Sequence, residues 1–280
     1  IECLRQGDNV TVKGKDVFAL SPNEVLKCRE SGSTLRFLVP VAMLLSKSVM
    51  FSGAEQLMRR PMDVYRSLAQ ENGLVFLQDG ETIVVKGPLK SGEYSVVGNV
   101  SSQFISGLLF ALPLLSGDST LKISTPIESR SYINMTIYAL SLFGIKIDWA
   151  DERTLLIKGN QKYNPCQVQV EGDYSNASFF EALNLFGSSV EVSGLVEDST
   201  QGDSVYRKYF EMFDNGIPSI HLGDCPDLGP ILFAVAAAKN GGVFSETRRL
   251  RIKESDRGAA MAEELKKFGV AVRIEEDSIV

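Results

Sequence analysis

Histidine and cysteine are scarce in this sequence, and their scarcity excludes several kinds of site. The only histidine is His221, which excludes the H-E-x-x-H motif and metal sites built on several histidines. The four cysteines lie far apart and form no C-x-x-C pair, so neither a zinc ribbon nor a thioredoxin-like redox motif is indicated. We expect reduced, mostly structural cysteines. Acid–base chemistry therefore falls to carboxylates, lysines or water.

Long apolar runs and an excess of positive charge are also missing. The longest apolar stretches, 104–115 and 231–238, fall short of the roughly 20 residues that a bilayer-spanning helix requires. The formal net charge of −6 argues against a broad nucleic-acid-binding surface, so any anion site must be built locally. What the sequence contains is 44% hydrophobic and 23% charged residues, a balance typical of a soluble globular protein.

A Lys-Gly pair after a β-branched residue recurs along the chain, at 12–14, 85–87 and 157–159. The spacings of 73 and 72 residues exceed the period of typical solenoids and fit a whole βα unit. Strand-like residues surround a turn in 75–85 and 145–157, and 270–280 has the same pattern. The sequence therefore predicts a repeated β-hairpin.

Helical patterns that end in glycine precede three of these hairpins, at 62–73, 132–144 and 258–269. Each hairpin is followed by another strand, a polar turn with glycine, and an apolar helix. The predicted repeat is strand, helix, strand, helix, strand, strand, which indicates an α/β fold. Because apolar residues are nearly contiguous in 104–112, we expect such helices to be buried inside a shell of sheets.

Several predicted helices begin in polar segments that suit an anion. The first N–H groups of a helix carry the positive end of its dipole, and small polar residues allow a phosphate or carboxylate to approach them. Ordinary N-capping is the alternative for any single start. Ser101-Ser102-Gln103 and Ser129-Arg130-Ser131-Tyr132 contain more hydroxyl groups and cations than one cap needs. Both segments are candidate phosphate sites.

Three arginines, Arg36, Arg60 and Arg257, lie in or beside the first turn of a predicted helix. A cation there opposes the helix dipole and is unfavourable by about 0.3 kcal/mol or more. Bidentate binding of a carboxylate or phosphate would explain an arginine at such a position.

Two carboxylates complete the candidate chemistry. Lys253 and Arg257 flank Glu254, an order that suits a carboxyl group tuned for proton transfer, although a solvated helix start with local ion pairs is the alternative. Asp227 is a second carboxylate at a helix start. Two carboxylates without histidine form a plausible acid–base pair.

These segments resemble the 3-phosphoshikimate 1-carboxyvinyltransferase family (5-enolpyruvylshikimate-3-phosphate synthases), in order and over essentially the whole chain. Ser-Ser-Gln-Phe at 101–104 together with Lys-Glu-Ser-Asp-Arg at 253–257 is highly specific. The remaining segments of the resemblance are 30–36, 60–61, 129–132, 171–173, 225–227 and 250–252.

The resemblance implies a two-lobed enolpyruvyl transferase fold, an inside-out α/β barrel of repeated βαβαββ units. We expect the first lobe over 1–168 and part of the second over 169–280. The implied reaction transfers the enolpyruvyl group from phosphoenolpyruvate to the 5-hydroxyl of 3-phosphoshikimate and releases phosphate. It needs no metal or organic cofactor and belongs to the shikimate pathway to chorismate and the aromatic amino acids. The resemblance further implies a cytoplasmic monomer, a glyphosate target, that binds small-molecule substrates and neither nucleic acid nor membrane.

The resemblance also implies roles for individual residues. Asp227 matches the family's proton acceptor and Glu254 its proton donor. The 3-phosphoshikimate site is matched by Ser101, Ser102, Gln103, Ser129, Asp227 and Lys253. The phosphoenolpyruvate site is matched by Gly32, Arg60, Gln103 and Arg257.

The chain departs from the family pattern in three respects, one of which is Phe37 after Arg36, where some relatives have proline. Arg249 stands where many relatives carry an asparagine that contacts 3-phosphoshikimate, which leaves that contact open. The family's early lysine and arginine contacts fall before Ile1, and its late arginine and lysine fall beyond Val280. We therefore expect a fragment that lacks both termini and shows no detectable turnover alone.

Two other functions stay open at this stage. UDP-N-acetylglucosamine 1-carboxyvinyltransferases share the fold but use a different sugar site and usually a loop cysteine, and Ser-Ser-Gln-Phe favours shikimate. A non-catalytic anion-binding module is the alternative of a different class. Selective binding of 3-phosphoshikimate would distinguish the three.

Overall fold

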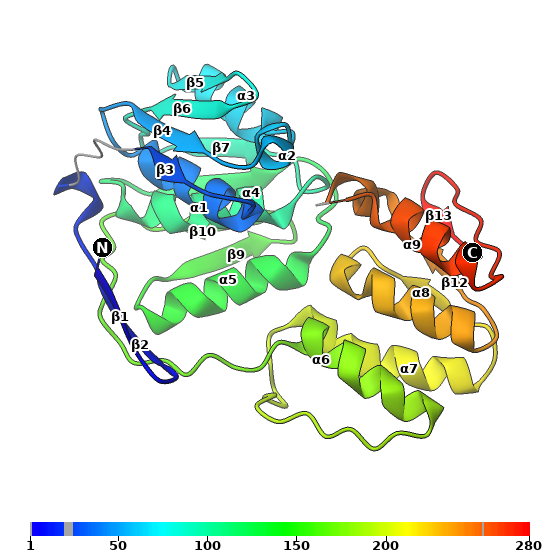
Figure 1. Cartoon of the computed structure of the whole chain (residues 1–280). Helices are drawn as coiled ribbons and strands as arrows, with labels where there is room; N and C mark the ends of the chain where they lie inside the picture. Colours follow the sequence, from blue (N-terminus) through cyan, green and yellow to red (C-terminus); the bar gives the residue numbers. More distant parts are fainter. Residues whose placement is uncertain (1, 20–24, 254) are drawn as a thin grey trace. The chain divides into compact units, whose positions relative to one another are not determined.

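The computed structural model describes residues 2–19, 25–253 and 255–280. An N-terminal hairpin of β1 (Glu2–Gln6) and β2 (Asn9–Lys13) precedes three copies of one chain pattern, which Figure 1 shows in sequence order. The first copy comprises β3 (Leu26–Lys27), α1 (Gly32–Ala42), β4 (Val49–Ser52), α3 (Asp63–Glu71), β5 (Val75–Gln78) and β6 (Thr82–Lys86), with the short α2 (Glu55–Met58) before α3. The second comprises β7 (Glu93–Val96), α4 (Ser102–Ala111), β8 (Ser119–Ile123), α5 (Arg130–Leu142), β9 (Ile147–Asp151) and β10 (Thr154–Ile157).

The third copy is β11 (Ser219–His221), α8 (Gly229–Ala238), β12 (Val243–Ser245), α9 (Arg257–Lys267) and a final hairpin. That hairpin pairs Ile274 with Ile279, and its second strand is β13 (Ser278–Ile279). Before this copy lie α6 (Tyr174–Glu181) and α7 (Tyr206–Asp214). The described residues also form short 3₁₀ helices: η1 (Val17–Ala19), η2 (Leu112–Leu114), η3 (Ala182–Phe186), η4 (Gly202–Val205), η5 (Pro226–Leu228) and η6 (Arg248–Ile252).

The sheets confirm the predicted repeat at the level of strand pairing. The first sheet has the order β3-β4-β6-β5 and the second the order β7-β8-β10-β9. In both, the first two strands of the order are parallel and the other pairings are antiparallel. The third sheet repeats the beginning of this order, because β11 is parallel to β12 and β12 is antiparallel to β13. Lys13 and Lys86 of the Lys-Gly pairs are the last residues of β2 and β6, and Lys158 directly follows β10.

Glycine ends the three predicted helices as expected. Gly73, Gly144 and Gly269 follow α3, α5 and α9 with φ values of 66°, 81° and 80°. These positive values lie in the left-handed region, which a residue without Cβ adopts at low cost. The helix therefore stops and the hairpin strand begins within a few residues.

The apolar helix α4 is buried, as its composition predicts. Phe104, Leu108 and Leu109 have no exposed surface, nor has Leu112, which directly follows the helix in η2. Gly107 brings α4 and α1 close, because a Cβ atom there would lie 2.3 Å from the carbonyl oxygen of Arg36. The hydroxyl group of Tyr65 lies 2.7 Å from the same oxygen and 2.9 Å from the carbonyl oxygen of Phe104, so it connects α1 and α4. No helix in the described part of the chain is long and apolar enough to cross a membrane.

The contacts divide the chain into two compact units, each with its own packed interior. Unit 1 contains 1–96, 103–123 and 147–162, and unit 2 contains 97–102, 124–146 and 163–280. The interior of unit 2 is formed by large apolar side chains such as Tyr174, Tyr206, Phe213, Leu232 and Phe244.

Candidate functional site

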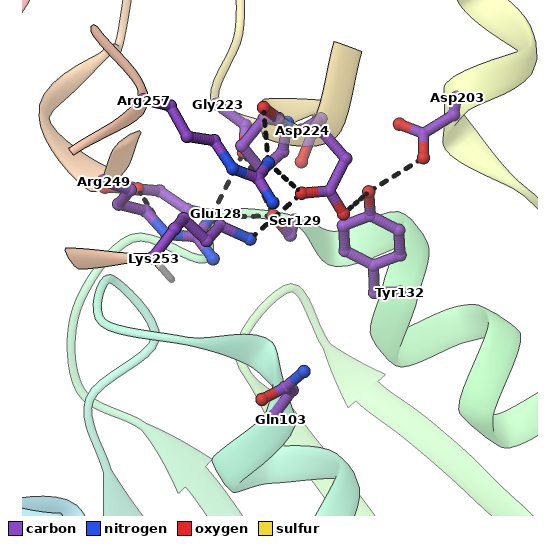
Figure 2. Close-up of polar contacts among 12 residues, drawn as sticks. Gln103, Glu128, Ser129, Tyr132, Asp203, Gly223, Asp224, Arg249, Lys253 and Arg257 are labelled. Atoms are coloured by element: carbon purple, nitrogen blue, oxygen red, sulfur yellow. Dashed lines mark hydrogen bonds and ion pairs between the residues drawn. The ribbon is translucent and has the colours of Figure 1, made fainter. Parts of the chain in front are cut away.

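Asp227 lies at the centre of a polar cluster in unit 2 that includes Tyr132, Lys253 and Arg257, which are labelled in Figure 2. It belongs to η5, which leads directly into α8. Its Oδ1 atom accepts a hydrogen bond of 2.5 Å from Nη1 of Arg257, the first residue of α9. The Nζ atom of Lys253, just after η6, lies 3.4 Å from the same oxygen. One carboxylate oxygen is therefore shared by two cations.

These charges set the protonation state of the cluster. Burial would raise the pKa of the Asp227 carboxyl group, but the positive charges of Lys253 and Arg257 outweigh burial and lower it. Asp227 is therefore ionised at neutral pH. The pKa of Lys253 is lowered by burial and by the nearby Arg249 and Arg257, in spite of the attraction of Asp227. Two cations thus face the one carboxylate of Asp227, and Asp203 adds a second carboxylate on the far side of Tyr132.

Ser129 and Arg249 form a second contact beside this cluster. Ser129 is fully buried, and its Oγ accepts a hydrogen bond of 2.7 Å from Nη1 of Arg249. The same Oγ lies 3.2 Å from the carbonyl oxygen of Gly223, which also accepts from Arg249 at 3.3 Å. Arg249 additionally pairs with Glu128, at 3.4 Å between Nε and Oε2. Burial is the main cause that lowers the pKa of this guanidinium and raises that of the Glu128 carboxyl.

Tyr132 connects Asp227 to a buried second carboxylate. The phenol oxygen of Tyr132, in the first turn of α5, lies 3.2 Å from Oδ2 of Asp227 and 2.9 Å from Oδ2 of Asp203. Asp203 lies in η4 and is only 5% exposed. Burial raises its pKa to about 6. Figure 2 shows the hydroxyl group of Tyr132 directed toward Asp203.

The structure separates ordinary caps from the other polar helix starts. Ser31, Asp173 and Asp256 are true N-caps, since each accepts a hydrogen bond from a backbone N–H three residues later. Ser129 precedes α5 in a left-handed conformation and makes no such bond. Asp227 does not cap its helix either. The Ser129 side chain contacts Gly223 and Arg249 instead, and that of Asp227 contacts Tyr132, Lys253 and Arg257.

The second predicted group forms part of unit 1. Gly32 is the first residue of α1, and a Cβ atom there would lie 2.9 Å from Nη1 of Arg60. The same atom would lie 3.7 Å from both Oε1 of Gln103 and Nη1 of Arg36. Arg36 donates a hydrogen bond of 2.9 Å to Oε1 of Gln103, in the first turn of α4. Two guanidinium groups and an amide thus surround a helix start with no side chain of its own.

The structure brings together most of the predicted residues within each unit. Asp227, Lys253 and Arg257 form one cluster, and Gly32, Arg60 and Gln103 form another. Ser101 and Ser102 stand at the start of α4, in a segment that is tied to the start of α5 by a hydrogen bond of 3.2 Å from Glu128 N to Gly98 O. Glu254 lies outside the described residues.

Sequence reasoning missed Glu128 and Asp203. Glu128 directly precedes Ser129, and Asp203 stands in Gln201-Gly202-Asp203, a polar segment before a helix. That pattern was the available signal, but it is equally typical of an N-cap.

A cavity of about 760 Å³ opens onto this cluster in unit 2. Its polar lining includes Tyr132, Asp203, Asp227 and Arg257, and its apolar lining includes side chains of α5 such as Met135 and Leu142. A cavity of this size with a few convergent charged groups is typical of small-molecule sites.

Comparisons with known proteins show the family of the chain. The profile of the family described as EPSP synthase (3-phosphoshikimate 1-carboxyvinyltransferase) matches residues 1–217 and 210–280. The 3-phosphoshikimate 1-carboxyvinyltransferase of Clostridium kluyveri is 38% identical over 99% of this chain and 70% of its own length. That of Clostridium novyi is 39% identical over 96% of this chain and 66% of its own length.

A solved structure shows the same fold. The EPSP synthase from Acinetobacter baumannii superposes with a TM-score of 0.71 at 22% identity, over 96% of this chain and 68% of that one. The chain thus spans about two thirds of the length of the proteins that it matches. With a family profile matched along its whole length and relatives of this similarity, the chain belongs to the EPSP synthase family, the 3-phosphoshikimate 1-carboxyvinyltransferases.

Proposed function

We propose that this chain carries active-site residues for transfer of the enolpyruvyl group from phosphoenolpyruvate to the 5-hydroxyl of 3-phosphoshikimate, with release of phosphate. The observation that carries the proposal is the Asp227 cluster, in which Arg257 and Lys253 share one carboxylate oxygen. Family membership supplies the identity of the two substrates. Each substrate carries a phosphate and a carboxylate, which charge-assisted hydrogen bonds from Lys253 and Arg257 would stabilise.

Asp227 is suited to accept the proton of the attacking hydroxyl. Its lowered pKa keeps it ionised, and its Oδ1 atom is fixed by Arg257, so that Oδ2 has a defined direction. As the new C–O bond forms, the hydroxyl becomes strongly acidic and its proton passes to the carboxylate. Lys253, beside Asp227, would contact 3-phosphoshikimate together with Ser101, Ser102, Gln103 and Ser129. The proton-donor role of Glu254 stays a prediction.

The group around Gly32 is suited to phosphoenolpyruvate. Because Gly32 has no side chain, the N-terminus of α1 is open to a small anion. The guanidinium group of Arg60 lies beside this open position and can bind the same anion. Gln103 and Arg36 flank the same space. We propose that Arg60 and Gln103 bind phosphoenolpyruvate here and that Arg257 is a further ligand of it.

We also propose that 1–168 forms the first lobe of the fold and 169–280 part of the second. We propose that the protein is a monomer in the cytoplasm that binds small molecules and no nucleic acid. Gel filtration with light scattering tests the monomer directly.

Calorimetry tests the proposed function. The chain is titrated with 3-phosphoshikimate, and then with phosphoenolpyruvate in its presence. Shikimate, inorganic phosphate and UDP-N-acetylglucosamine serve as competing ligands. We expect selective binding of 3-phosphoshikimate that is weakened by more than about tenfold in Asp227→Asn and Lys253→Met, since each loses a charge-assisted contact. Equal binding of inorganic phosphate would support an anion-binding module instead, and preference for the UDP sugar would support the other transferase.

A further inference from the structure

The side chain of Asp203 has a role that follows from the position of Tyr132. One phenol oxygen lies within hydrogen-bond distance of two carboxylates, 2.9 Å from Asp203 and 3.2 Å from Asp227. A phenol has one proton to donate. Burial and the two nearby carboxylates raise the pKa of Tyr132 well above its ordinary value, so the phenol keeps this proton. Only one of the carboxylates receives a full hydrogen bond at a time.

The surroundings of Asp203 and Asp227 determine which of the two carboxylates receives the hydrogen bond from Tyr132. Asp227 is partly neutralised by Arg257 and Lys253 on its Oδ1 atom. The Oδ1 atom of Asp203 is buried and finds no hydrogen-bond partner in the ranges that the structure describes. An ionised carboxylate in that position depends on Tyr132 for its stabilisation, because a buried charge without hydrogen bonds is costly. Asp203 is therefore the stronger acceptor when it is ionised.

We propose that Asp203 is a positioning residue that draws the Tyr132 proton away from Asp227, and so leaves Oδ2 of Asp227 open to the hydroxyl group of the substrate. The proposal rests on the role of Asp227 in the proposed function. It assigns a purpose to a buried carboxylate that has no other role in the proposed function.

The same geometry predicts that the hydrogen bonding of Oδ2 of Asp227, and with it the affinity for 3-phosphoshikimate, depends on pH. The charged and titratable groups that face Asp203 are Tyr132 from α5, Asp227 from η5, Asp173 at the start of α6, Lys253 after η6, and Cys225. Burial, the main cause, together with Asp227 and Asp173, raises the pKa of Asp203 to about 6, against the hydrogen bond of Tyr132 and the charge of Lys253. Below that pH Asp203 is protonated and no longer competes, so Tyr132 donates to Asp227 and occupies Oδ2.

The test compares Asp203→Asn with wild type. Asparagine has nearly the same shape but no charge, so Tyr132 should donate to Asp227 at every pH. We expect the affinity for 3-phosphoshikimate, measured by calorimetry, to be about tenfold weaker at pH 7.5, the value of one lost hydrogen bond. At pH 5 the two proteins should bind equally. The titration of the substrate phosphate is common to both proteins and cancels in the comparison.

A second variant separates this role from a structural one. In Tyr132→Phe there is no proton to direct, so adding Asp203→Asn to it should change the affinity by less than about twofold. Asp198→Asn replaces an exposed aspartate of the same segment and is the matched control. A tenfold loss that is the same at both pH values, or that persists in the Tyr132→Phe background, would overturn the proposal.

A measurement without substrate decides the proton sharing independently of the proposed function. The ¹³C carboxyl shift of Asp227 should show a step near pH 6, because the Tyr132 hydrogen bond arrives as Asp203 is protonated. The step should be absent from both Asp203→Asn and Tyr132→Phe. Presence of the step without any binding of 3-phosphoshikimate would reject the proposed function alone. Persistence of the step in both variants would reject the inference, whatever the protein binds.

Discussion

Arg249 donates a hydrogen bond of 2.7 Å from Nη1 to Oγ of Ser129, which lies 120 positions earlier in the sequence, and both side chains are buried. The same guanidinium pairs with Glu128, so its removal would leave a poorly solvated carboxylate without its buried cation. Breaking a buried pair in this way costs about 3 kcal/mol or more. We expect Arg249→Met to lower the free energy of unfolding by that amount in urea denaturation.

Arg248 offers a matched control for this prediction, because it contacts Glu128 at 3.6 Å from an exposed position. Arg248→Met should cost less than about 1 kcal/mol, as exposed ion pairs do. Adding Glu128→Gln to Arg249→Met should restore part of the loss. Equal costs for the two arginines would show that burial does not determine the strength of this contact.

Gly107 is predicted to be intolerant of any side chain. A Cβ atom there would lie 2.2 Å from the hydroxyl oxygen of Tyr65 and 2.3 Å from the backbone oxygen of Arg36. Because backbone cannot move aside cheaply, Gly107→Ala should destabilise unit 1 by about 3 kcal/mol. Gly117→Ala meets mainly the flexible Ser91 side chain and should cost less than about 1 kcal/mol. Thermal unfolding of both variants checks the difference, and a similar melting temperature would contradict it.

The repeat and its helices were predictable because their signals are local. A glycine after an amphipathic helix and a turn between two β-rich segments act within a few residues, and Gly73, Gly144 and Gly269 end their helices as predicted. The same holds for the buried helix α4, whose composition alone indicates burial on most sides. Strand order then follows from repetition of one unit.

The partners within the site were not predictable in the same way. Asp227, Lys253 and Arg257 were identified by type and position, but their sharing of one oxygen depends on the fold, which brings Lys253 and Arg257 to η5. Asp203 has the sequence pattern of a cap, and only its burial and its distance from Tyr132 distinguish it. Long-range contacts of this kind leave no periodic signal in a single sequence.

Gly32 is predicted to affect ligand binding more than stability. The Cβ atom of an alanine would approach Nη1 of Arg60 to 2.9 Å, and the end of an arginine side chain can shift. We expect Gly32→Ala to weaken phosphoenolpyruvate binding about tenfold by displacing this guanidinium, with a change in unfolding free energy below about 1 kcal/mol. Gly14→Ala, which meets no atom within 4 Å, is the control. Unaltered phosphoenolpyruvate affinity in calorimetry would argue against Arg60 as a ligand.

Asp203 should also make the stability of the protein depend on pH. Its pKa is about 6 in the folded protein and about 3.8 as an ordinary carboxyl group, so the folded state binds the proton more tightly. Stability from this group is therefore greatest below pH 4 and is lost as the pH rises through 6, by up to about 3 kcal/mol. Asp203→Asn lacks this titration. The unfolding free energy of the variant minus that of wild type should therefore increase between pH 4 and pH 7 in urea denaturation, whereas a constant difference would show that Asp203 is ionised as readily as an exposed aspartate.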